Sequence, residues 1–209
     1  MNVLRASYPD DAIVAEEGSG AGGSSRHRWY VDPLDGTVNY LYGIPHFSVA
    51  IACEDEAGLL ASVVYDPSRD ELFTAARGAG AWLRSERLRV SAPTDLAQSL
   101  VATGFAYGAE ARAEQARILN GVLPHVRDIR RFGSAQLDLA YTACGRFDGY
   151  FESVDKPWDW KAGALLVTEA GGRVTQLEQR RPGQPHVAAS PPAIHDALIA
   201  LLERAVQSP

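Results

Sequence analysis

The chain has 209 residues, of which 46% are hydrophobic and 22% charged. This balance is typical of a soluble globular protein and excludes disordered, collagen-like and coiled-coil chains. The 26 acidic and 20 basic residues give a formal charge of −6. Such a charge does not attract phosphate backbones, so we expect no nucleic-acid partner. A small anionic substrate remains possible, because a bound metal ion can reverse the local field.

Cysteine usage and apolar runs indicate where the protein resides. Cys53 and Cys144 lie far apart and outside any CxxC pairing, so we expect neither a disulfide nor a zinc site. We interpret them as reduced, buried side chains of a cytoplasmic protein, with a functional thiol as the weaker alternative. The N-terminus lacks the basic-then-apolar pattern of a signal peptide. The longest apolar runs, such as residues 49–53, are too short to span a bilayer, so we expect no membrane partner.

The first half of the chain predicts strands. A Gly/Ser-rich loop at 18–25 separates the first two strands, and Asp32-Pro33 is expected to stop the second. The later strands form an antiparallel meander. The predicted strands are 12–15, 29–31, 47–54, 59–65, 72–75, 81–83 and 100–103.

The second half alternates helices and strands. The helices are placed by helical spacing and by the Gly or Pro residues that end them. The predicted helices are 110–123, 134–144, 158–170 and 192–206, and the strands are 126–129, 149–151, 173–176 and 187–189. This order predicts an α/β (α+β) layered sandwich with two sheets. We expect one domain over residues 1–209, with a meander half (about 29–105) and an alternating half (about 106–209).

The most informative stretch is residues 32–40, DPLDGTVNY. Two carboxylates three residues apart, Asp32 and Asp35, can converge on one point, and Mg²⁺ prefers such oxygen ligands. The Leu34 carbonyl lies between them and could also bind a cation. Gly36 permits an unusual backbone angle, and a short helix could begin at Thr37, where N–H groups would face a phosphate. Asp-Pro alone would indicate an ordinary turn, but the whole string favours a site.

Three further acidic positions allow two interpretations each. Glu16-Glu17 is either a solvated pair or a site at the end of the 12–15 strand, where α/β sheets bind ligands. Asp159 is either the N-cap of the 158–170 helix or a third metal carboxylate. Glu152 is either a surface loop acid or an acceptor for sugar-like hydroxyls. We expect Glu169, Trp158 and Trp160 to be structural, and the five histidines to be surface or packing residues.

These residues resemble two signatures of the inositol monophosphatase family. Residues 32–40 are similar to the first signature and residues 158–172, WDWKAGALLVTEAGG, to the second, while Glu16-Glu17 matches the acidic pair that precedes the first. The resemblance extends over about residues 8–206, including RFGSA at 131–135 and GYFE at 149–152. It implies a Mg²⁺-dependent, Li⁺-sensitive phosphomonoesterase with an αβαβα sandwich, usually a homodimer.

The resemblance also implies a role for each site residue. Glu16, Asp32 and the Leu34 carbonyl would bind one Mg²⁺. Asp32, Asp35 and Asp159 would bind a second, and Glu16 would help to hold a weaker third. Thr37 and Glu16 would orient the attacking water, and the Gly36 and Thr37 N–H groups would hold the phosphate. The residues expected to line the inositol ring are Asp35, Ala135, Glu152 and Asp159. Paired metals suit this chemistry, because they stabilise both the attacking and the leaving oxygen.

The chain departs from the family pattern in two places. Family members carry two helices ahead of the point where this chain starts, so residues 1–4 are expected to end the second helix. Without those helices, an apolar sheet face should be exposed. Lys161 stands where the family usually has a small residue, and we expect it to point to solvent rather than to substrate.

The resulting functional prediction is hydrolysis of a small phosphate monoester, with myo-inositol 1-phosphate favoured as the substrate. Histidinol phosphate and other sugar or nucleotide phosphates are alternatives, and residues 103–107 and 152–157 are expected to decide among them. A non-catalytic protein that keeps the fold and binds a partner is the alternative of a different class. The full acidic set argues against that alternative, because a binding-only protein has no physical need of it.

Overall fold

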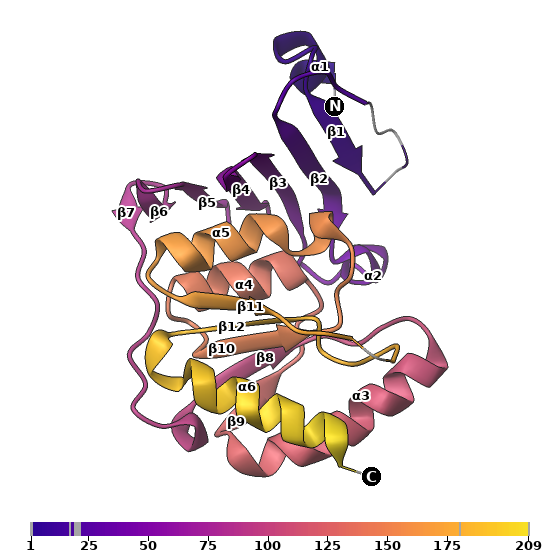
Figure 1. The fold of residues 1–209 in the computed structure, drawn as a ribbon, viewed down its shortest axis with the longest axis vertical. Helices are drawn as coiled ribbons and strands as arrows, with labels where there is room; N and C mark the ends of the chain where they lie inside the picture. Colours follow the sequence, from indigo (N-terminus) through magenta and orange to yellow (C-terminus); the bar gives the residue numbers. More distant parts are fainter. Residues whose placement is uncertain (1, 17, 19–21, 180, 209) are drawn as a thin grey trace.

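The computed structural model describes residues 2–16, 18, 22–179 and 181–208. Two β-sheets lie in separate layers, with a pair of helices between them and another pair on the far side of the second sheet (Figure 1). This arrangement confirms the layered α/β sandwich predicted from the sequence.

The first sheet contains seven strands whose order in space is their order along the chain. Its first two strands are parallel and the remaining neighbours are antiparallel, which confirms the predicted meander. The strands are β1 (Ala12–Ala15), β2 (Arg28–Asp35), β3 (Ser48–Asp55), β4 (Gly58–Asp66), β5 (Glu71–Ala76), β6 (Gly80–Leu83) and β7 (Glu86–Arg87). Because β1 and β2 run in the same direction, their C-terminal ends meet at one edge of the sheet.

The second strand is longer than predicted. We expected Asp32-Pro33 to stop it, but β2 continues to Asp35. Its pairing with β3 shifts register between Asp32 and Asp35. Such an irregularity removes the need for a ladder hydrogen bond from Pro33, which has no N–H group, so proline is tolerated there.

The second sheet has five strands in the spatial order β11-β12-β10-β8-β9. The pairs of β8 with β9 and with β10 are parallel, and both pairs made by β12 are antiparallel. The strands are β8 (Leu100–Thr103), β9 (Asp128–Arg130), β10 (Gly149–Glu152), β11 (Arg173–Gln176) and β12 (Val187–Ser190).

Most helices begin and end within three residues of their predicted bounds. The helix predicted at 158–170 is instead a short 3-10 helix followed by α5, which begins at Lys161. The α-helices are α1 (Asn2–Ser7), α2 (Thr37–Leu41), α3 (Ala109–Val122), α4 (Ala135–Ala143), α5 (Lys161–Glu169) and α6 (Pro192–Gln207), and the 3-10 helices are Leu96–Gln98, Leu123–His125 and Pro157–Asp159. In the part of the chain that the structure describes, no helix has the length and apolar character needed to cross a membrane.

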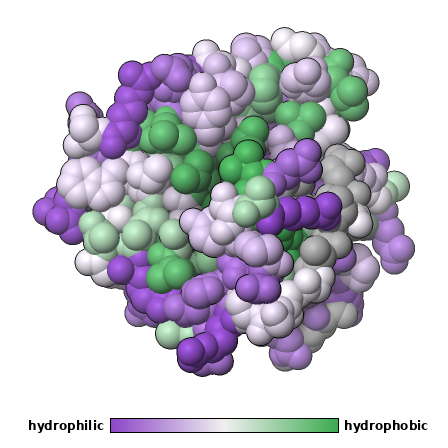
Figure 2. All heavy atoms as spheres, turned by 90° about the horizontal axis from the view of Figure 1, so that it is seen from above, coloured by the Kyte–Doolittle hydropathy of each residue, from purple (hydrophilic) through white to green (hydrophobic). Residues whose placement is uncertain are grey.

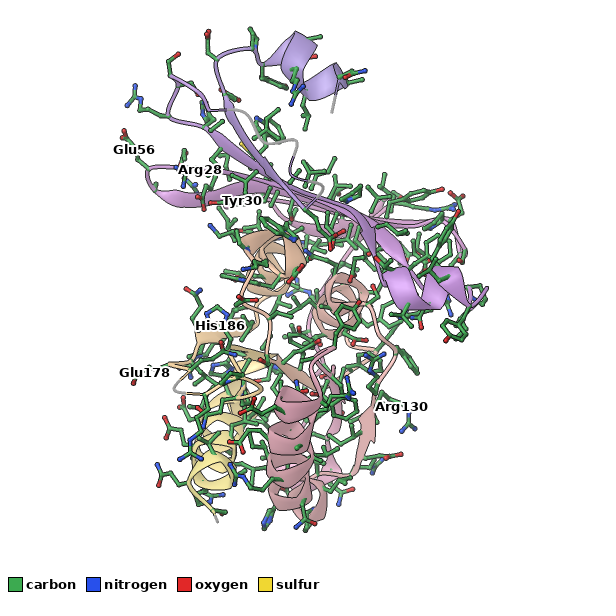
Figure 3. The ribbon with its side chains drawn as sticks, turned by 90° about the vertical axis from the view of Figure 1, so that its right-hand side faces the viewer. Arg28, Tyr30, Glu56, Arg130, Glu178 and His186 are labelled. Carbon is green, nitrogen blue, oxygen red and sulfur yellow. The ribbon has the colours of Figure 1, made fainter. Side chains whose placement is uncertain are left out.

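The helices α4 and α5 fill the space between the two sheets, as the side view shows (Figure 3). Every residue of α4 is buried, because this helix has protein on all sides. Its side chains and those of α5 pack against Tyr30 and Phe73 of the first sheet and Tyr150 of the second. On the other side of the second sheet, α3 and α6 cover a separate cluster that includes Phe151. The central helix layer therefore connects both sheets to one core.

The outer face of the first sheet, opposite α4 and α5, carries apolar side chains. The cross-strand register places two rows side by side on this face, and α1 packs over its β1–β2 end through Leu4. The rows contain Val49, Tyr65, Leu72, Ile51 and Val63. These side chains are half-buried or, for Leu72, exposed. Figure 2, which looks down on this face, shows hydrophobic residues gathered across its middle. Of the five, only Leu72 is exposed, so the expected exposure of an apolar sheet face is observed in part. Of residues 1–4, expected to end a helix, the structure describes Asn2 onwards, which lie in α1.

Candidate functional site

A cleft of about 270 Å³ opens where the ends of β1 and β2 approach the start of α4 and the end of β10. The cleft brings together every site residue predicted from the sequence that the structure describes. These residues are Glu16, Asp32, Leu34, Asp35, Gly36, Thr37, Ala135, Glu152 and Asp159. Glu17 lies outside the described residues.

Asp32 is a buried carboxyl group with only 3% of its surface exposed. The Leu34 N–H donates a hydrogen bond of 3.0 Å to its Oδ1. Burial, followed by the negative charges of Asp35, Glu16 and Asp159, raises the pKa of Asp32 to about 8. A buried carboxyl with such neighbours holds its proton unless a positive charge offsets the repulsion.

The turn after Asp32 depends on glycine. Gly36 has a φ of +86° and precedes the short helix α2. A Cβ atom here would lie 3.1 Å from the His46 carbonyl oxygen, so a side chain would be both strained and crowded. The first residue of α2, Thr37, donates from its hydroxyl to the Leu34 carbonyl at 2.8 Å. The side chain of Thr37 and the carbonyl of Leu34 are thereby held together at the cleft.

Asp35 is tied to the start of α4. Its carboxylate accepts the N–H groups of Ala135 and Gln136 at 3.2 and 2.9 Å. The hydroxyls of Ser48, at 3.1 Å, and Ser134 also donate to it. Burial raises the pKa of Asp35, and these four donors counteract the rise. The carboxylate therefore joins the first sheet to the central helix layer at the cleft.

Glu152 ends β10 and faces the backbone of Gly104. A Cβ atom on Gly104 would lie 1.8 Å from Glu152 Oε1, so a side chain at position 104 would displace this carboxyl. The Tyr150 hydroxyl donates to Glu152 Oε2 at 3.1 Å. Burial raises the pKa of Glu152 to about 7, although the Tyr150 hydrogen bond opposes the rise. The interpretation of Glu152 as a surface loop acid is thus wrong.

Asp159 ends a 3-10 helix, two residues before α5 begins. The residue preceding α5 is Trp160, and no side chain caps that helix. The alternative of Asp159 as a mere N-cap is therefore wrong. Burial, and then the charges of Asp35 and Glu16, raise the pKa of Asp159 to about 7.

Glu16 follows β1 directly, at the cleft edge of the first sheet. Its N–H group donates to the Val31 carbonyl at 3.4 Å, which continues the parallel pairing with β2. Its side chain is exposed. Glu16 therefore combines both interpretations of the acidic pair, since it stands at the strand ends in the cleft and its side chain is solvated.

The donor set suits Mg²⁺. Carboxylates and a carbonyl are the hard oxygen ligands that this ion binds, usually with water completing the shell. Burial, and then the neighbouring carboxylate charges, raise the pKa values of Asp32 and Asp159, so a cation in the cleft would favour their charged forms. Within residues 2–16, 18, 22–179 and 181–208, however, no three His, Cys, Asp or Glu side chains stand close enough together to hold an ion. The residues fit a divalent cation in chemistry and charge, and they require side-chain adjustment to enclose one.

Several lining residues lay outside the predicted site set. Arg131 brings a positive charge to the cleft, and Phe105, Ala106 and Tyr107 form one wall. Sequence reasoning named residues 103–107 as a substrate-selecting segment without assigning any single side chain. Arg131 belongs to the RFGSA stretch at 131–135 that carries part of the family resemblance, but the sequence assigned it no role of its own.

Lys161 contradicts the expectation that it points to solvent. Its ammonium group pairs with Glu54 and lies 4.1 Å from the centre of the Tyr30 ring. Tyr30 and Arg28, labelled in Figure 3, belong to the neighbouring strand β2. Glu54 also accepts the Tyr30 hydroxyl. The Lys161 side chain lies against the first sheet, because the Glu54 carboxylate and the face of the Tyr30 ring are both within its reach.

The remaining polar and aromatic predictions agree with the structure. Glu169 is structural, since its carboxylate accepts the N–H groups of Gly78 and Gly80, both at 2.9 Å. Trp160 is buried in the core and Trp158 packs against it. Both cysteines are free; Cys53 is buried as predicted, whereas Cys144 is half-buried.

The inositol monophosphatase family model matches residues 1–207 of the chain. Among curated relatives, Nus factor SuhB of Xylella fastidiosa is 50% identical over 176 residues, which are 84% of this chain and 64% of that protein. Nus factor SuhB of Escherichia coli K12 is 46% identical over 179 residues, 85% of this chain and 67% of that protein. The chain spans about two thirds of the length of these relatives.

Solved structures show the same fold. Inositol monophosphatase from Anabaena has a TM-score of 0.88 at 37% identity, with 97% of this chain and 82% of that chain covered. The extragenic suppressor protein suhB from Bartonella henselae has a TM-score of 0.86 at 41% identity, with 99% and 81% covered. On the family match and these likenesses, together with the cleft of acidic residues, the chain belongs to the inositol monophosphatase family.

Proposed function

We propose that the chain hydrolyses a small phosphate monoester in a Mg²⁺-dependent reaction, with myo-inositol 1-phosphate as the substrate. The observation that carries this proposal is the convergence on one cleft of Glu16, Asp32, Asp35 and Asp159, which come from three parts of the fold and stand beside Thr37 and Gly36. Hydrolysis by this route needs no covalent nucleophile, which agrees with a cleft lined by carboxylates rather than by a Ser-His or Cys-His pair.

Each acid has a proposed role. Glu16, Asp32 and the Leu34 carbonyl would hold one Mg²⁺, and Asp32, Asp35 and Asp159 a second, with Glu16 contributing to a third. Bound Mg²⁺ would lower the pKa of a water molecule and stabilise the charge on the leaving oxygen. Thr37 and Glu16 would orient that water, and the N–H groups of Gly36 and Thr37 would hold the phosphate.

The leaving group would lie on the other side of the cleft. Glu152 and Asp159 would accept hydrogen bonds from its hydroxyls, with Asp35 and Ala135 beside the ring. Glu152 supports this role because the backbone of Gly104 and the Tyr150 hydroxyl fix its carboxyl in the cleft. An acid at this position recognises a hydroxyl or an ammonium group, so histidinol phosphate is the alternative substrate to include in a test.

The test is phosphate release from a panel of phosphomonoesters in Mg²⁺, in EDTA, and in Mg²⁺ with Li⁺. The expected result is turnover of inositol phosphate that EDTA abolishes and Li⁺ inhibits. Asp32→Asn should remove both turnover and Mg²⁺ binding in calorimetry. Unchanged turnover by this variant would refute the metal assignment.

A second candidate function is the one that the relatives' name states, a Nus factor. It is favoured by a run of exposed apolar side chains directly after the cleft, formed by Val38, Tyr40, Leu41, Tyr42 and Ile44. Such a patch on a protein surface commonly marks an interface. If the protein binds no Mg²⁺ at millimolar concentration and releases phosphate from none of the phosphomonoesters, this partner-binding role would be favoured over catalysis.

The same segment supports the homodimer that the family resemblance implies. We propose that residues 38–44 of two copies meet, because aromatic and aliphatic side chains are enriched at the centres of protein interfaces. Sedimentation of the wild type and of Leu41→Glu tests this proposal. A dimer that Leu41→Glu dissociates supports it, and an unchanged dimer would move the interface elsewhere. A cytoplasmic location stays a prediction from cysteine usage.

A further inference from the structure

The wall of the cleft formed by residues 104–107 is not part of any helix or strand. It is nevertheless held in place by side chains of α3 and by Arg131, and it packs against Glu152. The strand β8 ends at Thr103 and α3 begins at Ala109. A backbone segment between such elements has no ladder partners of its own, so its carbonyl groups must be satisfied in another way.

Side chains supply those partners. Gln115, a buried residue of α3 with 7% of its surface exposed, accepts the Ala106 N–H at 2.9 Å and donates to the Gly104 carbonyl at 3.4 Å. Arg112, one turn earlier, donates to the carbonyls of Ala106, at 3.2 Å, and Tyr107. Two side chains on one face of α3 therefore hold three of the four carbonyls.

The fourth carbonyl is held from across the cleft. Arg131 donates to the Phe105 carbonyl at 3.5 Å, and its guanidinium lies 5.8 Å from the centre of the Phe105 ring. The glycine at position 104 stands directly against Glu152. The segment is thus a preorganised wall rather than a loose loop, since every carbonyl from 104 to 107 receives a side-chain donor.

Of the three wall residues that line the cleft, Phe105, Ala106 and Tyr107, only Tyr107 is exposed. It lines the cleft, and 77% of its surface is exposed. Desolvation and then the charge of Glu16 raise the pKa of its phenol, with Asp35 and Asp159 adding to the rise and Arg131 opposing it. At neutral pH the phenol keeps its proton and can donate a hydrogen bond.

We propose that Tyr107 is a specificity-determining residue that contacts the leaving group of the substrate, and that Gln115 and Arg112 are positioning residues that hold it in place. The leaving group would be a hydroxylated ring, because a tyrosine offers a flat face to ring C–H groups and a hydroxyl to a polar substituent. The proposal rests on the proposed phosphatase function, and it adds the residues that select among phosphomonoesters.

The experiment compares two substrates on the whole chain at saturating Mg²⁺. Myo-inositol 1-phosphate carries a hydroxylated ring, and glycerol 2-phosphate does not. Tyr107→Ala should raise KM for inositol 1-phosphate about tenfold, the loss expected for one well-placed contact, with kcat changed less than about twofold. The KM for glycerol 2-phosphate should change less than about threefold.

Variants of α3 test the positioning role. Gln115→Ala should reproduce the substrate-dependent rise in KM. Gln115→Glu should show a smaller rise, because a carboxylate still accepts the Ala106 N–H. Gln98→Ala and Tyr8→Ala are matched controls on other surfaces and should leave both KM values unchanged. Equal changes for the two substrates, or a fall in kcat without a change in KM, would overturn the proposal.

A direct binding measurement separates this inference from the proposed function. If the wild type releases phosphate from neither substrate, the proposed function fails. Calorimetric titration with myo-inositol 1-phosphate then decides the inference: a roughly tenfold weaker affinity in Tyr107→Ala supports it. Equal affinity, or no binding by the wild type, overturns it.

Discussion

Asp32 and Asp35 are three residues apart and serve the fold in opposite ways. Asp32 accepts one backbone hydrogen bond, and burial, followed by the charges of the surrounding acids, raises its pKa to about 8. Asp35 accepts four donors, two of them N–H groups at the start of α4. The negative charge of Asp35 therefore stabilises a helix end, whereas that of Asp32 is repelled when no cation is bound.

Neutralising these two acids should change stability in opposite directions. In EDTA at pH 8, Asp35→Asn should lower the free energy of unfolding by about 1–3 kcal/mol, because an amide cannot accept all four donors. Asp32→Asn should raise it by roughly 1 kcal/mol, because the repulsion is removed. Urea denaturation measures both, and a loss of stability in Asp32→Asn would contradict the view that its charge is uncompensated.

The raised pKa values of Asp32 and Asp159 predict how the stabilisation of the fold by Mg²⁺ depends on pH. The pKa of Asp32 rises from 3.8 to about 8 on folding, so its contribution to stability is complete below pH 4 and is lost as pH rises towards 8. Asp159, with a pKa of about 7, acts in the same direction. Mg²⁺ binds the charged forms and should offset the loss.

The increase in melting temperature that Mg²⁺ produces should therefore be larger at pH 8 than at pH 6. Differential scanning fluorimetry at both pH values, with and without Mg²⁺, measures it. In Asp32→Asn the difference between the two pH values should shrink. An equal increase at both pH values would mean that protons and Mg²⁺ do not compete for these groups.

At the scale of elements, α5 is fixed at both ends by polar contacts. At its start, Lys161 pairs with Glu54 of β3. At its end, Glu169 accepts two N–H groups from the turn between β5 and β6. The helix is thereby aligned across the first sheet, and the 3-10 turn that carries Asp159 is aligned with it.

Glu169→Ala should cost about 1–2 kcal/mol of stability, because two N–H groups lose their acceptor. Its effect on KM and kcat should be small, since the residue lies at the opposite end of α5 from Asp159. Glu203→Ala, an exposed acid on α6, serves as the control. A fall in kcat without a fall in stability would assign Glu169 a role at the cleft that its contacts do not show.

The sequence predicted the bounds of an element well where residues next to that element determine them. The strands 100–103 and 173–176 have their predicted bounds, and each is flanked by a glycine, Gly104 after the first and Gly172 before the second. The continuation of β2 past Pro33 was not predicted, because a bulge depends on the partner strand. Neither was the position of Lys161, since its partners Glu54 and Tyr30 lie far away in the sequence.

The candidate site was predictable for a related reason. Asp32, Asp35 and Asp159 lie in two continuous signatures and Glu16 precedes the first, so the sequence alone could group them, and the structure places them on one cleft. The roles of Gln115 and Arg112 could not be predicted from the sequence in this way. Their contacts cross from α3 to an irregular segment, and no spacing in the sequence specifies such a pairing.

At the scale of the whole molecule, the two faces of the first sheet differ. The inner face packs against α4 and α5, while the outer face leaves Leu72 40% exposed beside Tyr65 and Val49. Single exposed hydrophobic residues are common, but adjacent rows of partly exposed apolar side chains favour association with other apolar molecules.

This outer face should bind a hydrophobic dye such as 8-anilinonaphthalene-1-sulfonate in the native state. Leu72→Glu should reduce the fluorescence increase of the dye without changing the melting temperature by more than a few degrees. Leu123→Glu, at an exposed leucine elsewhere, should leave the fluorescence unchanged. Equal fluorescence in all three proteins would show that the dye binds at another surface.

The wall at residues 104–107 has a consequence for how such a protein diversifies. Its shape is set by side chains of α3 and by Arg131, and strand pairing takes no part in it. Substitutions in the helix can therefore reshape the recognition surface while the sheets and the acidic cluster stay as they are. Transplanting residues 104–115 together with Arg131 from one relative into another should therefore transfer the leaving-group preference, because these residues set the shape of the wall.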